Sequence, residues 1–526
     1  MAINRLLFIV IILAAFLRFY QIASNPPGLY WDEAAMGYDA YSILKSARDH
    51  HGKFMPLFPE SFGDWKMPVY IYTLIPSVAV FGLSEFSVRF PSALSGTLTV
   101  LVFFYLIKKL TKDSKLALLS ALFLAISPWH IQFSRAAFEA TIGLFFFSTA
   151  LLLLLVGFEK PKSWYFTASF IFFVVSIYSY HAYRIFTPLF LIFLFYLFRK
   201  EVLVNLKKII LPAAVSFILL LPIISFSLSS QGRDRLTSQS AFDKDKAEKI
   251  RIDFDQSSKR PLRFLSGYIF PRESYWSYLT LNAYLDHFSP NFLFTSGDSI
   301  GRHSQVDMGQ IFLFDGVLLS LAIFFLKKLN SNTKKVILLW LFIAPIPATF
   351  VVPTPHALRS LQMVIPLTFL MATGAYYIFK NARLVVNCAI VFIMIYSFAN
   401  YLHLLFSHYP KKFSADWQDG YRQMVKILKT HQERFDKVYI TDIYNVPYIY
   451  LLFYLKYEPA KFQMQNGSRF SFDKYVFVKR DTHVFEKGQI LYVAPVWEKV
   501  DGIWLDSTYD RQRRPIYNLW EVRSEN

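Results

Sequence analysis

Long apolar runs dominate the chain, and they restrict its fold more than any other feature. A helix that crosses a bilayer needs roughly 20 mainly apolar residues, and 54% of the 526 residues are hydrophobic. A water-soluble core does not require such runs, so the sequence predicts a polytopic α-helical membrane protein. We expect about 11 transmembrane helices, at residues 3–22, 89–107, 116–133, 140–157, 164–181, 185–198, 209–228, 310–326, 336–352, 360–379 and 384–406.

Basic residues in the short loops predict which side of the membrane each loop faces. They cluster after the second, fourth, sixth, eighth and tenth predicted helices, as in Lys108 with Lys109 and Lys327 with Lys328. These loops are expected to be cytoplasmic, which accounts for the net charge of +19 without nucleic acid as a partner. The segments expected outside are 23–88, 134–139, 182–184, 229–309, 353–359 and the tail from residue 407.

Two segments near the N-terminus qualify this topology. Residues 3–22 resemble a signal peptide, but Arg18 and Tyr20 stand where a small-residue cleavage site belongs, so we expect an uncleaved anchor. Residues 68–83 are apolar but short, and a span there would reverse the side of every later basic cluster. We therefore expect an interfacial or re-entrant helix at 68–83.

The chain is expected to have two parts, a transmembrane module at 1–406 and a small extracytoplasmic α/β domain at 407–526. The module includes the first outer loop, 23–88, and a large outer loop, 229–309. In the tail, helical patterns at 421–429 and 447–457 alternate with strand-like runs at 438–441, 474–478, 490–494 and 516–522.

An acidic pair, Asp32 and Glu33, stands directly after the N-terminal apolar run. A carboxylate at a membrane boundary can accept the proton of an acceptor hydroxyl as that hydroxyl attacks. For an isolated Asp-Glu, helix capping or a charge pair with a nearby Lys or Arg is the simpler explanation, and only the motifs around it favour the catalytic one. Later in the same loop, Lys66 would lie at headgroup level, where it either binds a lipid phosphate or only snorkels towards the surface.

Other charged residues gather at the outer ends of predicted helices. Arg89 begins the second helix, where a guanidinium can pair with a carboxylate or a phosphate, or merely anchor the helix. Arg135 and Glu139 stand four residues apart, so a local ion pair is the simplest expectation. His356 and Arg359 share a later boundary, but no histidine pair has a metal spacing such as His-Glu-x-x-His.

Four motifs together resemble one family. They are Asp32-Glu33 early in a long outer loop, Lys66-Met-Pro before an interfacial helix, Ser84-Glu-Phe-Ser-Val-Arg-Phe-Pro-Ser-Ala-Leu-Ser-Gly at the second span, and Ser134-Arg-Ala-Ala-Phe-Glu after the third. The chain resembles the superfamily of dolichyl-phosphate-mannose protein mannosyltransferases and aminoarabinose lipid A transferases, of glycosyltransferase family 39 type. These are membrane glycosyltransferases of GT-C fold, and the likeness covers roughly residues 1–160.

The resemblance implies a hexosyl or pentosyl transferase that moves a sugar from a polyprenyl-phosphate donor to an acceptor hydroxyl on the extracytoplasmic face. Asp32 matches the acidic residue proposed as general base, and Glu33 is its partner in the motif. Lys66 matches the lysine that meets the lipid phosphate, and Arg89 the functional arginine at the second span. Glu139 stands where the family has an acidic residue, usually Asp.

The resemblance also gives expectations for the donor phosphate, a metal ion, the acceptor and the membrane. Arg135 and Arg359 are additional candidates for the donor phosphate, and a single catalytic carboxylate predicts inversion at the anomeric carbon. Asp64 only approximates the acidic residue beside the family lysine, and with His356 it is a weak metal candidate. A divalent metal is not required by the sequence. The acceptor is a protein, lipid or glycan, and the resemblance favours a prokaryotic plasma membrane.

Two other classes of function remain open. A transporter or flippase of lipid-linked sugars would also have many helices, but its halves usually repeat and its charges lie at the midplane. No repeat is visible here, and the ionisable residues gather at one face. A receptor or scaffold built around the tail would leave the acidic and basic motifs without a task.

Overall fold

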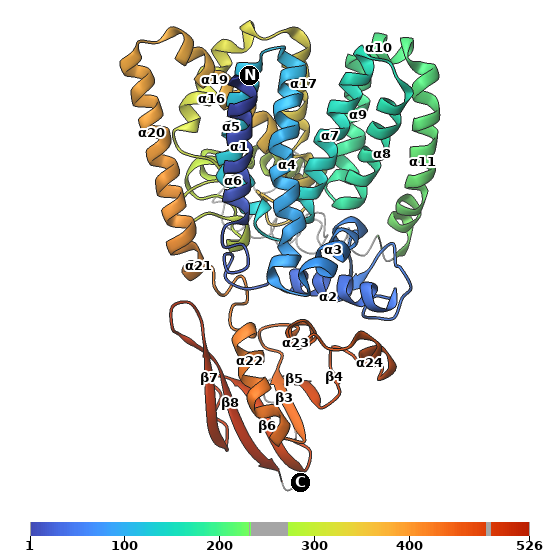
Figure 1. Ribbon diagram of the computed structural model, residues 1–526, viewed down its shortest axis with the longest axis vertical. Coiled ribbons are helices and arrows are strands. Elements are labelled where there is room, and N and C mark those ends of the chain that lie inside the picture. The colour runs from blue at the N-terminus through green and yellow to red at the C-terminus, as the bar shows by residue number, and fades with distance from the viewer. Residues whose placement is uncertain (1, 231, 233–271, 480–484, 525–526) are drawn as a thin grey trace, which may run out of the picture. The chain divides into compact units, whose positions relative to one another are not determined.

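The computed structural model describes residues 2–230, 232, 272–479 and 485–524, so the large loop expected at 229–309 lies partly outside the described residues. The chain forms two compact units (Figure 1). The helical unit comprises Met1–Arg18, Leu94–Ser134 and Phe138–Tyr401. The mixed unit comprises Phe19–Ala93, Arg135–Ala137 and Leu402–Asn526.

The helical unit is a bundle of mostly apolar helices. Aromatic side chains fill its interior: the ring of Phe147 lies edge-on to Phe190 and Trp340, with centroid distances of 5.2 and 5.0 Å. The helices are α1 (Ala2–Phe19), most of α4 (Glu85–Thr111), α5 (Ser114–Ile126), α6 (Pro128–Ser134), α7 (Glu139–Glu159), α8 (Ser163–Ser179), α9 (Tyr183–Leu197), α10 (Arg199–Val204), α11 (Leu206–Leu228), α15 (Arg272–Asp286), α16 (Asp315–Phe325), α17 (Ser331–Ile343), α18 (Ile346–Thr349), α19 (Val364–Asn381) and α20 (Leu384–His403).

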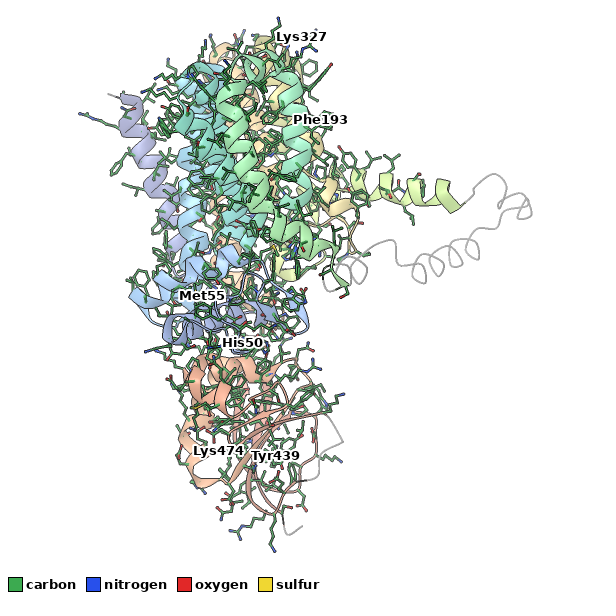
Figure 2. All side chains as sticks on the ribbon, turned by 90° about the vertical axis from the view of Figure 1, so that its right-hand side faces the viewer. His50, Met55, Phe193, Lys327, Tyr439 and Lys474 are labelled. Atoms are coloured by element: carbon green, nitrogen blue, oxygen red, sulfur yellow. The ribbon has the colours of Figure 1, made fainter. Side chains whose placement is uncertain are left out.

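Six helices in the described residues are long and apolar enough to cross a membrane, or up to seven if the bent pair α5 and α6 is one span. This confirms a multi-pass membrane protein. The expected count of about 11 is not confirmed, because several helices in the remaining apolar runs are short; α16 has 11 residues and α17 has 13. Phe193 on α9 is 48% exposed, as a lipid-facing residue would be, and Lys327 lies at one end of this unit (Figure 2).

The first part of the mixed unit contains α2 (Trp31–Ser46), a short hairpin of β1 (Glu60–Ser61) and β2 (Asp64–Trp65), and α3 (Pro68–Phe81). Gly63 has a φ of +77°, which allows the tight turn between the two strands. The expected helix at 68–83 is thus present as α3, with 14 residues. Its interfacial or re-entrant placement stays a prediction.

The tail of the mixed unit folds as the expected α/β region. Its six-stranded sheet has the order β4-β5-β3-β6-β8-β7, in which β3 is parallel to β5 and β6 and the other pairs are antiparallel. Tyr439 lies on the central strand β3, and Lys474 lies just before β5 (Figure 2). Strands β4 and β7 had not been expected. The elements are α21 (Tyr409–Lys412), α22 (Tyr421–His431), β3 (Lys437–Thr441), α23 (Pro447–Leu455), α24 (Pro459–Met464), β4 (Ser471–Phe472), β5 (Tyr475–Val478), β6 (Gly488–Pro495), β7 (Ile503–Tyr509) and β8 (Pro515–Ser524).

Candidate active site

Asp32 and Glu33 lie in the first turn of α2, within the mixed unit. Carboxylates are favourable there because the exposed backbone N–H groups give the N-terminus of a helix a partial positive charge. The two side chains nevertheless have different surroundings. Asp32 is 32% exposed, whereas Glu33 is 4% exposed.

Glu33 is a buried structural acceptor with four hydrogen-bond donors. Its Oε2 accepts from the backbone N of Tyr30 at 3.1 Å and from Arg89 Nη2 at 2.9 Å. Its Oε1 accepts from Arg89 Nε at 3.0 Å and from the backbone N of Ala137 at 2.8 Å. The carboxylate therefore joins the start of α2 to two segments that are distant in the sequence.

Arg89 is fully buried, and all five of its N–H donors are used. Two bind Glu33. Nη1 donates to the carbonyls of Ile22 and Pro26 at 3.0 and 2.8 Å, and Nη2 donates to the carbonyl of Gly28. In this geometry the guanidinium has no donor left for a phosphate; it fixes the segment that leads into α2.

Arg135 holds the same segment from a second direction. It is also fully buried, and its Nη2 donates to the carbonyls of Tyr20 and Asn25 at 2.9 and 2.8 Å. Its guanidinium lies over the ring of Phe406 at 5.2 Å from the centroid. Two arginines that were expected to meet a donor phosphate thus bind backbone carbonyls between residues 20 and 28.

Lys66 is paired with Asp32. Its Nζ donates to Asp32 Oδ1 at 2.6 Å, and the lysine side chain is only 9% exposed. Lys66 directly follows β2, and its backbone N donates to the carbonyl of Pro59 at 2.8 Å, so the hairpin sets its position. Asp64, in the same hairpin, accepts a hydrogen bond from the backbone N of Trp65 at 2.8 Å.

The tail contributes to the same region of the mixed unit, which sequence reasoning missed. Gln418 Oε1 accepts from the backbone N of Trp31 at 3.1 Å and from the hydroxyl of Tyr450 at 2.5 Å. The Tyr450 hydroxyl also contacts the carbonyl of Leu29 at 3.1 Å. Residues 418 and 450 therefore hold the turn that carries Asp32, although no local pattern in the sequence marks them.

The remaining expected residues belong to the helical unit. Glu139 is the first residue of α7, and Arg359 and His356 lie in the segment between α18 and α19. His356 gathers there with Asp298 and His303, two residues that carry no local sequence signal. Burial raises the pKa of Asp298, but His303 and His356 outweigh it and lower that pKa to about 2. Burial lowers the pKa of both histidines.

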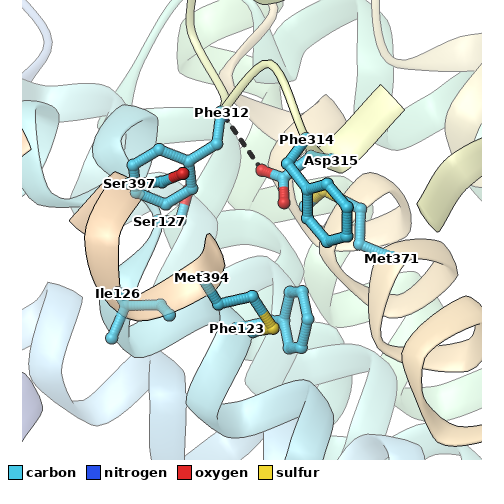
Figure 3. A pocket seen from close by; sticks show the side chains of 9 residues that line it. All are labelled: Phe123, Ile126, Ser127, Phe312, Phe314, Asp315, Met371, Met394 and Ser397. Carbon is cyan, nitrogen blue, oxygen red and sulfur yellow. Dashed lines mark hydrogen bonds between the residues drawn. The ribbon is translucent and has the colours of Figure 1, made fainter. Parts of the chain in front are cut away.

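A cavity elsewhere in the helical unit contains none of the expected residues. Its carboxylate, Asp315, is the first residue of α16 and accepts a hydrogen bond from the backbone N of Phe312, just before the helix, at 3.0 Å (Figure 3). Its walls are otherwise apolar or weakly polar. The lining residues are Phe123, Ile126, Ser127, Phe312, Phe314, Asp315, Met371, Met394 and Ser397.

Comparison with known proteins gives one family match. The sequence profile of the dolichyl-phosphate-mannose-protein mannosyltransferase family matches residues 66–226, a segment that contains Lys66, Arg89, Arg135 and Glu139. No protein with a curated description matches the sequence.

Two solved structures have similar architectures. ArnT from Cupriavidus metallidurans, solved with undecaprenyl phosphate, matches with a TM-score of 0.56 and 11% identity over 97% of each chain. The apo oligosaccharyltransferase of Archaeoglobus fulgidus matches with a TM-score of 0.51 and 14% identity, over 86% of this chain and 63% of its own. This chain thus spans less than two thirds of that enzyme. The chain has the GT-C glycosyltransferase fold that its sequence resembles.

Proposed function

We propose that the chain is a glycosyltransferase that moves a sugar from a polyprenyl-phosphate donor to an acceptor hydroxyl. The observation that carries the proposal is the Asp32–Lys66 pair, in which a partly exposed carboxylate and a lysine lie 2.6 Å apart at the start of a helix. The match to a mannosyltransferase family profile supports it, and so does the shared fold with ArnT, which was solved with a polyprenyl phosphate.

Asp32 is the proposed general base. A sugar bonded to a lipid phosphate has a good leaving group, so the demanding step is activation of the acceptor hydroxyl. Asp32 would accept the hydroxyl proton while the hydroxyl oxygen bonds to the anomeric carbon and the phosphate departs with the electron pair. One carboxylate acting in one displacement gives inversion, in contrast with the double displacement of retaining glycosidases.

Lys66 is the proposed link between the base and the donor. Its ammonium group is a compact positive charge that contacts Asp32. A lysine so placed could orient the carboxylate and also stabilise the growing charge on the departing phosphate. The expected phosphate roles of Lys66 and Arg359 therefore remain part of the proposal, and so does the expected catalytic role of Glu139.

Glu33, Arg89 and Arg135 are proposed as positioning residues, which revises the roles taken from the resemblance. Glu33 has its acceptor sites filled by Tyr30, Arg89 and Ala137, so it is a poor candidate for proton transfer. Arg89 and Arg135 bind carbonyls of the segment before α2. Their effect on the reaction would be to hold Asp32 in place.

The finer features of the proposal concern topology and substrates. We propose a transmembrane module at 1–406 with about 11 spans, an outer domain at 407–526, and an active site on the extracytoplasmic face of a prokaryotic plasma membrane. The positive-inside pattern of the loops supports this orientation. The donor carries a hexose or pentose, and the acceptor is a protein, lipid or glycan.

A conversion assay separates this function from the alternative, a flippase or transporter of lipid-linked sugars. Membranes containing the chain are incubated with a panel of polyprenyl-phosphate sugars labelled in the sugar. We expect one donor to be consumed, with one free polyprenyl phosphate released for each labelled acceptor and with inverted anomeric configuration by NMR. Movement of an intact donor between leaflets, without cleavage of the sugar–phosphate bond, would support the flippase instead.

A further inference from the structure

Asp298, His303 and His356 form a compact buried cluster in the helical unit. Asp298 and His303 come from the segment before α16, and His356 comes from the segment before α19. Their exposed fractions are 4%, 5% and 5%. One potential ligand atom from each lies within 4.8 Å of the others.

The two imidazoles present nitrogens that protein hydrogen bonds leave unused. His303 Nδ1 and His356 Nδ1 are buried and have no hydrogen-bond partner among the described residues. They lie 3.4 and 3.8 Å from Asp298 Oδ2, and neither contact has the geometry of a hydrogen bond. Buried polar atoms normally have a hydrogen-bond partner. Two buried nitrogens without one, both beside the same carboxylate, are therefore unusual and suggest that they bind a ligand.

Backbone groups hold the carboxylate between the two segments. Asp298 Oδ1 accepts from the backbone N of Ile300 at 2.9 Å. Oδ2 accepts from the backbone N of Ala357 at 2.7 Å, so the second segment is fastened to the first beside His356. Hydrogen bonds of this kind orient metal-binding carboxylates and are part of most metal sites.

His287 lies beside the cluster but is not one of its potential metal ligands. Its Nδ1 faces the carbonyl of Ala283 at 2.8 Å, and its Nε2 is 3.1 Å from the backbone N of His356. Because the carbonyl can only accept and the backbone N–H can only donate, Nδ1 carries the proton and Nε2 is the acceptor. Both nitrogens are therefore engaged. His287 fixes the backbone of His356 and does not act as a ligand.

The α6 helix holds both segments from another side. The indole N–H of Trp129 donates to the carbonyl of Ala357 at 3.2 Å. Gln132 Nε2 donates to the carbonyl of Arg302 at 3.1 Å. These contacts place the backbone on either side of the cluster independently of the three side chains, as a preorganised ligand site requires.

We propose that Asp298, His303 and His356 bind a divalent transition-metal ion, for which zinc is the best chemical match. One carboxylate and two imidazoles are a ligand set that zinc uses, and three protein ligands leave one position of a tetrahedron for water or another ligand. The ion would replace the missing hydrogen bonds of both imidazoles. It would tie the segment before α16 to the segment before α19.

The test uses the full-length protein in detergent, after removal of metal with a chelator and return of zinc alone. We expect one tightly bound zinc per chain by elemental analysis and a higher thermal midpoint with zinc than without it. His303→Gln and His356→Gln should each weaken zinc binding at least tenfold, the scale of effect known even for residues around the ligands. Cobalt in place of zinc should give the visible spectrum of a tetrahedral site.

A matched control separates this site from adventitious binding by histidines. His403 and His408 form an exposed pair, with their Nε2 atoms 3.1 Å apart. Replacing both by Gln should leave the tight zinc unchanged. The proposal is overturned if the wild-type protein retains no stoichiometric zinc, or if folded His303→Gln protein binds zinc as tightly as the wild type. The wild-type stoichiometry decides the matter even if a variant does not fold.

Discussion

Replacement of Arg89 by Met distinguishes a positioning role from a contact with the donor phosphate. The variant keeps an apolar stem but removes both bonds to Glu33 and the bonds to the carbonyls of Ile22, Pro26 and Gly28. Breaking a buried pair by removing one partner costs about 3–5 kcal/mol, because the other charge stays buried without compensation. We therefore expect a loss of stability of that size.

The assay is denaturant unfolding in detergent, with Arg514→Met as the matched control. Arg514 is 61% exposed and pairs with Asp510 four residues earlier. The Asp510 carboxylate keeps its hydrogen bonds from the backbone N of Gln512 and of residue 514 in the variant, so the loss of the arginine should cost only about 0–1 kcal/mol. Arg89→Lys keeps the positive charge but loses the planar set of five N–H donors. Its loss of stability should lie between those of Arg89→Met and Arg514→Met. The reasoning is refuted if Arg89→Met unfolds at the wild-type midpoint while its affinity for the lipid-phosphate donor falls.

Two further predictions concern pairs in the mixed unit. Lys66→Met should weaken donor binding more than acceptor binding, because it removes a cation beside Asp32; the equivalent change at Lys53, which pairs with Glu60 at the surface, should leave both unchanged in a titration with labelled donor. Burial lowers the pKa of His50, but Asp39, 2.5 Å away, outweighs this and raises it overall. The pair's stabilisation is then complete below about pH 6.5 and is lost as the pH rises through the raised value, so His50→Gln should cost more at pH 6 than at pH 9 in unfolding experiments.

Local patterns predicted many of the helices and four of the six tail strands, β3, β5, β6 and β8, because those elements depend on nearby residues. The apolar run at 3–22 overlaps nearly all of α1, the run at 140–157 lies within α7, and the strand-like run at 490–494 lies within β6. Span counts were harder to predict. Hydropathy alone does not reveal that the run at 116–133 breaks into α5 and α6 with a bend of 58°.

The site residues divide according to the distance of their partners in the sequence. Asp32 and Glu33 look equivalent as neighbours in the sequence, and only the fold makes one carboxylate partly exposed and the other buried. The partners of Glu33 are distant: Arg89 is 56 residues later and Ala137 is 104 residues later. Asp298 and Ala357 are likewise 59 residues apart. Such pairings arise from tertiary packing, and the spacing of residues in a single sequence cannot predict them.

The central claim, that Asp32 activates the acceptor, is tested most directly by sugar transfer with Asp32→Asn. The change preserves shape and removes the proton acceptor, and the loss of a general base typically costs about 10²–10⁴-fold in rate. Glu60→Gln, at a comparable surface carboxylate paired with a lysine, is the control. The account predicts that Asp32→Asn retains the fold and binds donor but transfers sugar at least a hundredfold more slowly. Transfer at the wild-type rate by folded Asp32→Asn protein would contradict it.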